Sequence, residues 1–198
     1  VLIGGHKRAR RAYGFDEVSV APGAATIDPN DADTSFSIGP HQFKIPILAS
    51  AMDGAVSPLV CQVLGKLGGL AVLNLEGLFT RFDDYQAQLD RVVNASQENV
   101  VPLLQGIYRE PVKPELVAAR VKEIKADGTL AAGAVAPAGF DTAGRAALEA
   151  GLDILVITST VTSAHHYSST GKSLSISDLC SKSNVPVIVG NVVTYEAA

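Results

Sequence analysis

The feature that most constrains the fold is a pattern that repeats from about residue 46: an apolar run, a polar or glycine-containing end, and a helix-like stretch that closes at glycine. The apolar runs lie at residues 45–49, 70–73, 130–135, 153–158 and 187–194. Runs that are apolar throughout are typical of strands buried on both faces, and such strands are parallel. Alternation of such strands with helices, at a spacing of about 25 to 35 residues, predicts right-handed βαβ units.

The stretches between these runs carry helix signals. Ser57 followed by Pro58 offers an N-cap and a first-turn proline, and Gly68-Gly69 ends that helix. Further helices are expected over residues 83–94, 114–126 and 141–151, with glycine at or just after the end of the last two. Residues 100–104 are ambiguous, and a short extra strand is one interpretation.

Two architectures accommodate five such units. An open, doubly wound sheet is one, but its last strand would lack a covering element because residues 194–198 only begin a helix. We therefore predict an α/β chain that supplies roughly the first five units of a (β/α)8 TIM barrel, with the rest beyond Ala198. Residues 1–45 are expected to form an amino-terminal arm and extension, and residues 46–198 the truncated barrel.

Composition excludes several classes of protein. Of the 198 residues, 47% are hydrophobic, which is ample for a buried core. A net charge of −4 gives no general attraction for nucleic acid or anionic lipid, so neither is expected as a partner. No apolar stretch approaches the roughly 20 residues that span a bilayer. A soluble, cytoplasmic protein is expected, with a plastid location left open because the chain starts at Val1 rather than methionine.

The chain has four basic residues near its amino terminus and two cysteines. The basic cluster (Lys7, Arg8, Arg10 and Arg11) is interpreted as a solvated arm, or else as a contact with an acidic neighbouring subunit or a nucleotide phosphate. Cys61 and Cys180 are too few for a disulfide framework and indicate a reducing compartment. Both lie in predicted helices, so both are expected to be small core residues.

Four segments occur in an order that resembles one enzyme family. Residues 10–17, 46–53, 68–77 and 187–194 are together similar to the IMP dehydrogenase/GMP reductase family, most of all to its short branch without CBS domains. The resemblance covers essentially the whole chain. It implies a purine nucleotide oxidoreductase that binds IMP, GMP or XMP, uses NAD or NADP, and assembles as a homotetramer or octamer.

The resemblance also implies a substrate site at the carboxyl ends of the strands. Ser50 would bond the phosphate or ribose, and Met52 would flank the base. Gly190 and Asn191 end the fifth strand, where Asn191 would orient the purine. Asp53 is either a ribose acceptor or, as we slightly prefer, a structural carboxylate that accepts backbone N–H groups.

The chain departs from the family pattern at two strand ends. Where the family has an aspartate that contacts ribose, this chain has Thr158, Ser159 and Thr160, whose hydroxyls remain possible ribose or cofactor contacts. At the second strand end, Glu76 would supply a base, bind an amine, or simply face solvent. His165-His166 is a poor metal pair because adjacent strand residues point to opposite faces, so a loop position is expected and no metal site is predicted.

The family's reaction needs a cysteine thiolate that adds to C2 of the purine, on an exposed glycine-rich loop. Neither cysteine here fits, so no catalytic residue is predicted within the chain. The nucleophile and a monovalent-cation site are expected downstream, and the chain alone is expected to be inactive. The alternatives are a non-catalytic purine-nucleotide-binding homologue and another phosphate-binding barrel.

Overall fold

The computed structural model describes residues 2–3, 7–11, 13–167 and 173–193. The chain divides into two compact units, residues 1–33 and 34–198. The first unit holds an antiparallel pair, β1 (Leu2–Ile3) and β2 (Lys7–Arg8), and the short 3-10 turns η1 (Phe15–Glu17) and η2 (Pro29–Asp31). Within this unit Arg11 forms an ion pair with Glu17 at 3.3 Å, and both side chains are solvated.

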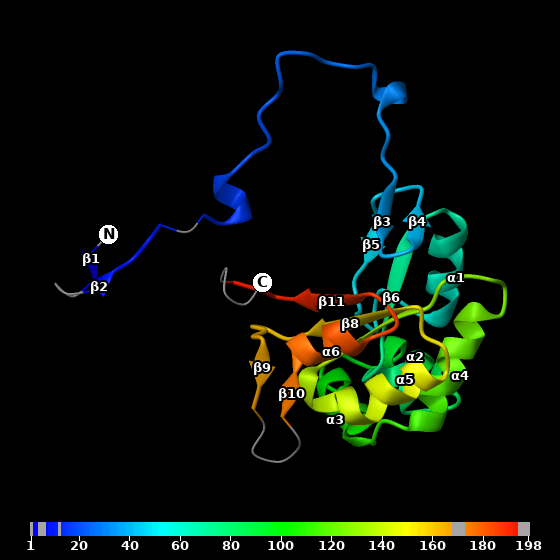
Figure 1. The fold of residues 1–198 in the computed structure, drawn as a ribbon. Helices are drawn as coiled ribbons and strands as arrows, with labels where there is room; N and C mark the ends of the chain where they lie inside the picture. The colour runs from blue at the N-terminus through cyan, green and yellow to red at the C-terminus, as the bar shows by residue number, and fades with distance from the viewer. Residues whose placement is uncertain (1, 4–6, 12, 168–172, 194–198) are drawn as a thin grey trace. The chain divides into compact units, whose positions relative to one another are not determined.

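A five-stranded parallel sheet forms the centre of the second unit. Its strands are β5 (Leu48–Ala49), β6 (Leu70–Asn74), β7 (Ala132–Val135), β8 (Ile154–Thr158) and β11 (Val187–Gly190), paired side by side in chain order. A doubly wound sheet would reverse its order at a switch point, so this winding is that of a barrel. Figure 1 shows the helices gathered along one side of the sheet. The predicted parallel α/β organisation is confirmed.

The helices begin and end close to the residues predicted from the sequence. They include α1 (Pro58–Lys66), α2 (Tyr85–Val93), α4 (Pro114–Lys125), the π-helix η5 (Phe140–Gly144) running into α5 (Arg145–Glu149), and α6 (Ile176–Lys182). Ser57 Oγ accepts a hydrogen bond of 3.2 Å from Val60 N, which confirms the predicted N-cap. Gly68 has a φ of +91°, a left-handed conformation that disfavours other residues, and so ends α1.

Two interpretations of local structure were wrong. Residues 100–104 belong to helix α3 (Val100–Arg109) rather than to a strand, because Leu103 and Ile107, four residues apart, both pack on the core. His165-His166 is not in a loop: it forms strand β9 (His165–His166), paired with β10 (Leu174–Ser175). The fifth strand ends at Gly190, as predicted from Gly190-Asn191, and Thr194, the last residue of its apolar run, lies outside the described residues.

The two faces of the sheet bury different clusters. The side chains that alternate along the strands, such as Leu73, Leu155 and Ile157, pack with the helices in the larger cluster. The intervening ones, including Val72, Ala134 and Ile154, form a smaller inner cluster. This alternation is what a barrel wall produces, with one face toward the helices and the other toward the interior.

A hairpin before the first barrel strand packs on the inner cluster. It consists of β3 (Phe36–Ile38) and β4 (His41–Phe43), whose Phe36 and Phe43 rings stack at 4.9 Å. Phe43 is buried beside Leu70. Because of this packing the compact unit begins at Thr34, ahead of residue 46, where the barrel was expected to start.

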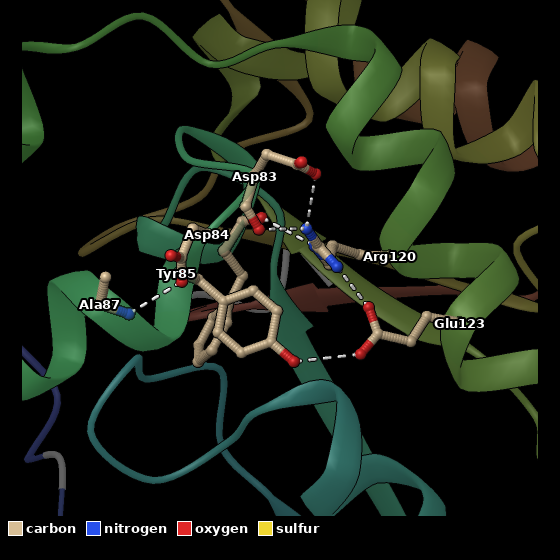
Figure 2. Close-up of polar contacts among 7 residues, drawn as sticks. Asp83, Asp84, Tyr85, Ala87, Arg120 and Glu123 are labelled. Atoms are coloured by element: carbon tan, nitrogen blue, oxygen red, sulfur yellow. Dashed lines mark hydrogen bonds and ion pairs between the residues drawn. The ribbon is translucent and has the colours of Figure 1, made fainter.

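One buried cation ties α4 to the connection that precedes α2. The Arg120 side chain is only 9% exposed; its Nε donates to the Phe79 carbonyl at 3.1 Å and it pairs with Glu123. It also donates to the Asp83 carbonyl at 3.1 Å and lies 4.7 Å from the centre of the Tyr85 ring (Figure 2). A buried charge needs such full pairing, so this network fixes the layer of helices outside the sheet.

No helix among the described residues is long and apolar enough to cross a bilayer.

Candidate functional site

The residues selected from the sequence all lie at the carboxyl edge of the parallel sheet. Ser50, Met52 and Asp53 follow β5, Glu76 follows β6, Thr158–Thr160 end and follow β8, and Gly190-Asn191 end β11. Because parallel strands bring their carboxyl ends to one edge, the fold collects these side chains along a single rim. They fall into two hydrogen-bonded groups, one at β5–β6–β7 and one at β8–β11.

Asp53 is the centre of the first group. Its Oδ2 accepts hydrogen bonds of 2.6 Å from both the backbone N–H of Leu78 and the hydroxyl of Tyr108. Its Oδ1 accepts one of 3.1 Å from Asn74 Nδ2. A carboxylate that already accepts three donors has little capacity left for a ribose, so the geometry favours the structural role among the two that the sequence left open.

The backbone beside Asp53 approaches too closely for a side chain. A Cβ atom on Gly77 would lie 2.0 Å from Asp53 Oδ1, well inside any real contact. Glycine at this position therefore lets the β6 turn close over the carboxylate. The end of β5 and the end of β6 are thereby joined into one rigid corner.

Tyr108 enters this corner from α3 and was not among the residues predicted from the sequence. Burial raises the pKa of Tyr108, and the hydrogen bond to the Asp53 carboxylate raises it further, so the phenol keeps its proton and donates it. The guanidinium of Arg81 lies 5.5 Å from the centre of the Tyr108 ring and donates to the carbonyls of Glu76 and Glu110. No sequence signal pointed to Tyr108, because its segment lacks a motif.

Glu76 connects β6 to β7. Its Oε2 accepts a hydrogen bond of 2.6 Å from the Ala136 N–H, and the residue is half-buried. A Cβ on Gly139 would lie 2.2 Å from Glu76 Oε1, so glycine is required where the carboxylate rests. One oxygen of Glu76 is thus committed to the backbone.

Ser50 and Met52, by contrast, face outward from the same corner. Met52 is 57% exposed, and Ser50 is also exposed. Their loop is a tight turn in which Met52 N donates to the Ser50 carbonyl at 2.8 Å. Within the described residues no hydrogen bond joins this group to Asn191, so the two groups occupy separate parts of the rim.

The second group closes the end of β8 onto the end of β11. Ser159 N donates to the Gly190 carbonyl at 2.9 Å, and Asn191 N donates to the Ser159 carbonyl at 3.0 Å. Thr162 Oγ1 donates to the Gly190 carbonyl at 2.7 Å and lies 3.1 Å from Ser159 Oγ. The Ser159 hydroxyl is therefore structural, whereas Thr158 and Thr160 are exposed at the rim. Thr162 is buried; the hydroxyl-rich run after β8 was the only signal for it.

Neither cysteine lies at this rim. Cys61 is buried within α1, and burial raises the pKa of its thiol to about 12. Cys180 lies on α6 and is exposed, so the prediction that it is a core residue was wrong: its position on this short amphipathic helix faces solvent. The described residues contain no group of three or more histidine, cysteine or acidic residues able to hold a metal ion.

Comparison with known proteins identifies the family. Residues 12–198 match the domain described as IMP dehydrogenase / GMP reductase domain. An uncharacterised oxidoreductase of Mycobacterium tuberculosis is 34% identical over 203 residues, a match that covers 100% of this chain and 54% of that protein. The inosine-5'-monophosphate dehydrogenase of Methanocaldococcus jannaschii is 36% identical over 66 residues, 33% of this chain and 13% of that protein.

A solved structure agrees. The IMP dehydrogenase/GMP reductase-like protein of Corynebacterium glutamicum superimposes with a TM-score of 0.85 at 30% identity, covering 100% of this chain and 53% of that one. The chain thus spans about half the length of the relatives that it matches along its whole length. The predicted fold, the first five units of a (β/α)8 barrel, is confirmed as a half-barrel of the same type. The chain belongs to the IMP dehydrogenase/GMP reductase family.

Proposed function

We propose that the protein is a purine nucleotide oxidoreductase, and that the carboxyl rim of the half-barrel holds the nucleotide. The observation that carries the proposal is the rim itself. In a barrel of this family, exposed Ser50 and Met52 stand on a corner that Asp53 holds rigid. A binding site needs exposed contact groups on a fixed support, and this corner supplies both.

Each rim residue has a role in this proposal. The Ser50 hydroxyl donates to a phosphate or ribose oxygen, and the exposed Met52 thioether packs against the purine face. Asn191, held by backbone bonds to Ser159 and Thr162, orients the base with its amide, and Gly190 allows close approach. Asp53 supports these contacts and does not itself bind ribose.

A nicotinamide cofactor, NAD or NADP, fits the remaining donors. Thr158 and Thr160 are exposed after β8 and present hydroxyls that both donate to and accept from ribose hydroxyls. They carry no charge, so they give no preference against a 2′-phosphate. Glu76 keeps one carboxylate oxygen, Oε1, that does not accept from Ala136 N and lies against Gly139. The cofactor would supply the hydride chemistry.

The reacting thiol is proposed to lie outside these 198 residues, together with a monovalent-cation site. Cys61 has its pKa raised to about 12, the wrong direction for a nucleophile, and Cys180 lies on α6 away from the rim. The chain alone is therefore expected to be inactive. We also propose that the protein assembles as a homotetramer or octamer and is located in the cytoplasm.

The test is an assay of the protein expressed from its complete coding sequence. It is supplied with IMP plus NAD, and separately with GMP plus NADPH, while nicotinamide absorbance is followed. Turnover with either pair supports the proposal and selects between the two reactions. Saturable IMP or GMP binding without turnover identifies a non-catalytic nucleotide-binding homologue. If the protein shows no binding and no turnover, the proposal is overturned, and another phosphate-binding barrel remains as the alternative.

A further inference from the structure

We propose that Tyr108 is a positioning residue for the nucleotide site: through Asp53 it fixes the loop of residues 50–54, which carries Ser50 and Met52. The inference rests on the proposed function, which it deepens by naming a residue that acts without touching the ligand. Three observations carry it: the origin of Tyr108, the geometry at Asp53, and the anchoring of the loop.

Tyr108 comes from a helix that the βα repeat does not require. The connection between β6 and β7 contains α2, α3 and α4, where one helix would suffice. The residue before Tyr108, Ile107, is buried at 2% exposure and fixes the last turn of α3 on the core. The tyrosine therefore projects from a well-held turn.

The contact with Asp53 is short and charge-assisted. The Tyr108 hydroxyl lies 2.6 Å from Asp53 Oδ2, the oxygen that also accepts from Leu78 N. Hydrogen bonds to an ionised carboxylate are stronger than those between neutral groups. The Arg81 guanidinium, 5.5 Å from the ring centre, holds the aromatic ring from one side and leaves the hydroxyl aimed at the carboxylate.

Asp53 is the side-chain anchor of its loop. Between Ser50 and Val56 it is the one side chain, among described residues, with hydrogen bonds to other elements. The remaining bonds of the loop are internal: Ala55 N and Val56 N both donate to the Met52 carbonyl at 2.9 Å. The turn is thus a compact body whose polar attachment is Asp53 and whose apolar attachment is the buried Val56, and loosening the polar attachment is expected to displace Ser50 and Met52 together.

The chain offers a matched control. Tyr85 also donates its hydroxyl to a carboxylate, Glu123 Oε1 at 3.1 Å, and also contacts an arginine through its ring. Burial raises its pKa as it does that of Tyr108. Tyr85, however, belongs to the network of Figure 2 in the helical layer. Tyr85→Phe therefore removes a comparable hydrogen bond without touching the rim.

The experiment compares wild type, Tyr108→Phe and Tyr85→Phe in the protein expressed from its complete coding sequence. Affinity for IMP is measured by calorimetry, and hydrogen–deuterium exchange is followed in the peptide that covers residues 50–56. Tyr108→Phe is expected to weaken IMP binding about tenfold and to speed exchange in that peptide, since one hydrogen bond to a charged group is lost. Tyr85→Phe should leave both within about twofold of wild type.

Asp53→Asn provides a second variant if Tyr108→Phe does not fold, because its amide NH₂ would face a donor and loosen the same anchor. If wild type binds IMP and Tyr108→Phe binds it with the same affinity and shows the same hydrogen exchange in the 50–56 peptide, the inference is overturned while the proposed function stands. Equal weakening by Tyr85→Phe overturns it too, because the effect would then be one of general stability. A wild-type protein that binds no purine nucleotide ends the proposed function and this inference together.

Discussion

The Glu76 carboxylate accepts a hydrogen bond of 2.6 Å from the backbone N–H of Ala136, so the end of β6 is fastened to the end of β7 at the rim. Strand pairing alone links the bodies of these strands. This contact continues the link past their last paired residues, Asn74 and Ala134, into the loops at the rim.

Removing the Glu76 acceptor should destabilise the protein modestly. Glu76→Ala leaves the Ala136 N–H without its partner and is expected to lower the free energy of unfolding by about 1–2 kcal/mol. Glu76→Gln keeps an oxygen acceptor and should cost less. Gly139→Ala forces its Cβ against Glu76 Oε1 and should destabilise the wild type more than the Glu76→Ala background. Urea unfolding of wild type, the three single variants and the Glu76→Ala/Gly139→Ala double variant checks this. Additive losses in the free energy of unfolding for Glu76→Ala and Gly139→Ala would contradict the contact.

Arg120 should be among the most sensitive single positions outside the rim. Arg120→Met removes a buried cation and leaves the carbonyls of Phe79 and Asp83, and Glu123 Oε2, without the donor that they share. A loss of about 3 kcal/mol is expected. The control is Arg145→Met, whose exposed guanidinium pairs with Asp141 at 2.8 Å and should cost less than about 1 kcal/mol. If the two variants lose similar free energies of unfolding, the Arg120 network stabilises the protein no more than an exposed ion pair does.

The two cysteines should differ sharply in reactivity. In the native protein an aromatic disulfide reagent should modify Cys180, which is exposed. Cys61 should react only after unfolding, because it is buried and its pKa is raised to about 12. Peptide mapping by mass spectrometry after native labelling, for wild type and Cys180→Ser, assigns the label to each cysteine. Rapid labelling of the Cys61 peptide in the native protein would contradict the burial of Cys61.

Stability should fall at alkaline pH through Tyr108. Its folded-state pKa is raised above the ordinary value of 10.0. Below pH 10 both folded and unfolded chains keep the proton, and the stabilisation is fully present. As pH rises past about 10 the unfolded chain ionises first, so unfolding becomes easier. Cys61 and Tyr85 act in the same direction. The difference between wild type and Tyr108→Phe isolates the Tyr108 contribution, which should be constant below about pH 10 and shrink as the pH rises from there toward about 12.

Much of the fold was predictable because its signals are local. Fully apolar runs indicated parallel strands, and the pair Ser57 and Gly68 marked the start and end of α1. Residues 100–104 were not predictable in the same way, since a short apolar run fits a strand or a helix, and packing of Leu103 and Ile107 decided between them.

The candidate site was likewise predictable only where its signals are local. Residues that follow strands, such as Asp53 and Glu76, were predictable as rim residues from their place in the repeat. Their partners were not, because Tyr108 and the Ala136 N–H approach from other units of the chain, and no spacing rule connects residues brought together only by the closed sheet. The exposure of Cys180 was missed for a similar reason: α6 is too short for its sequence to fix which face is buried.

The most direct test of the nucleotide site is a calorimetric titration of IMP into the protein expressed from its complete coding sequence, as wild type and as Ser50→Ala. Our account predicts saturable one-site binding by wild type. It also predicts an affinity about tenfold weaker in Ser50→Ala, because a phosphate or ribose oxygen loses its hydroxyl donor. Binding that is absent in wild type, or equally tight in both proteins, would contradict the assignment of the carboxyl rim as the purine nucleotide site.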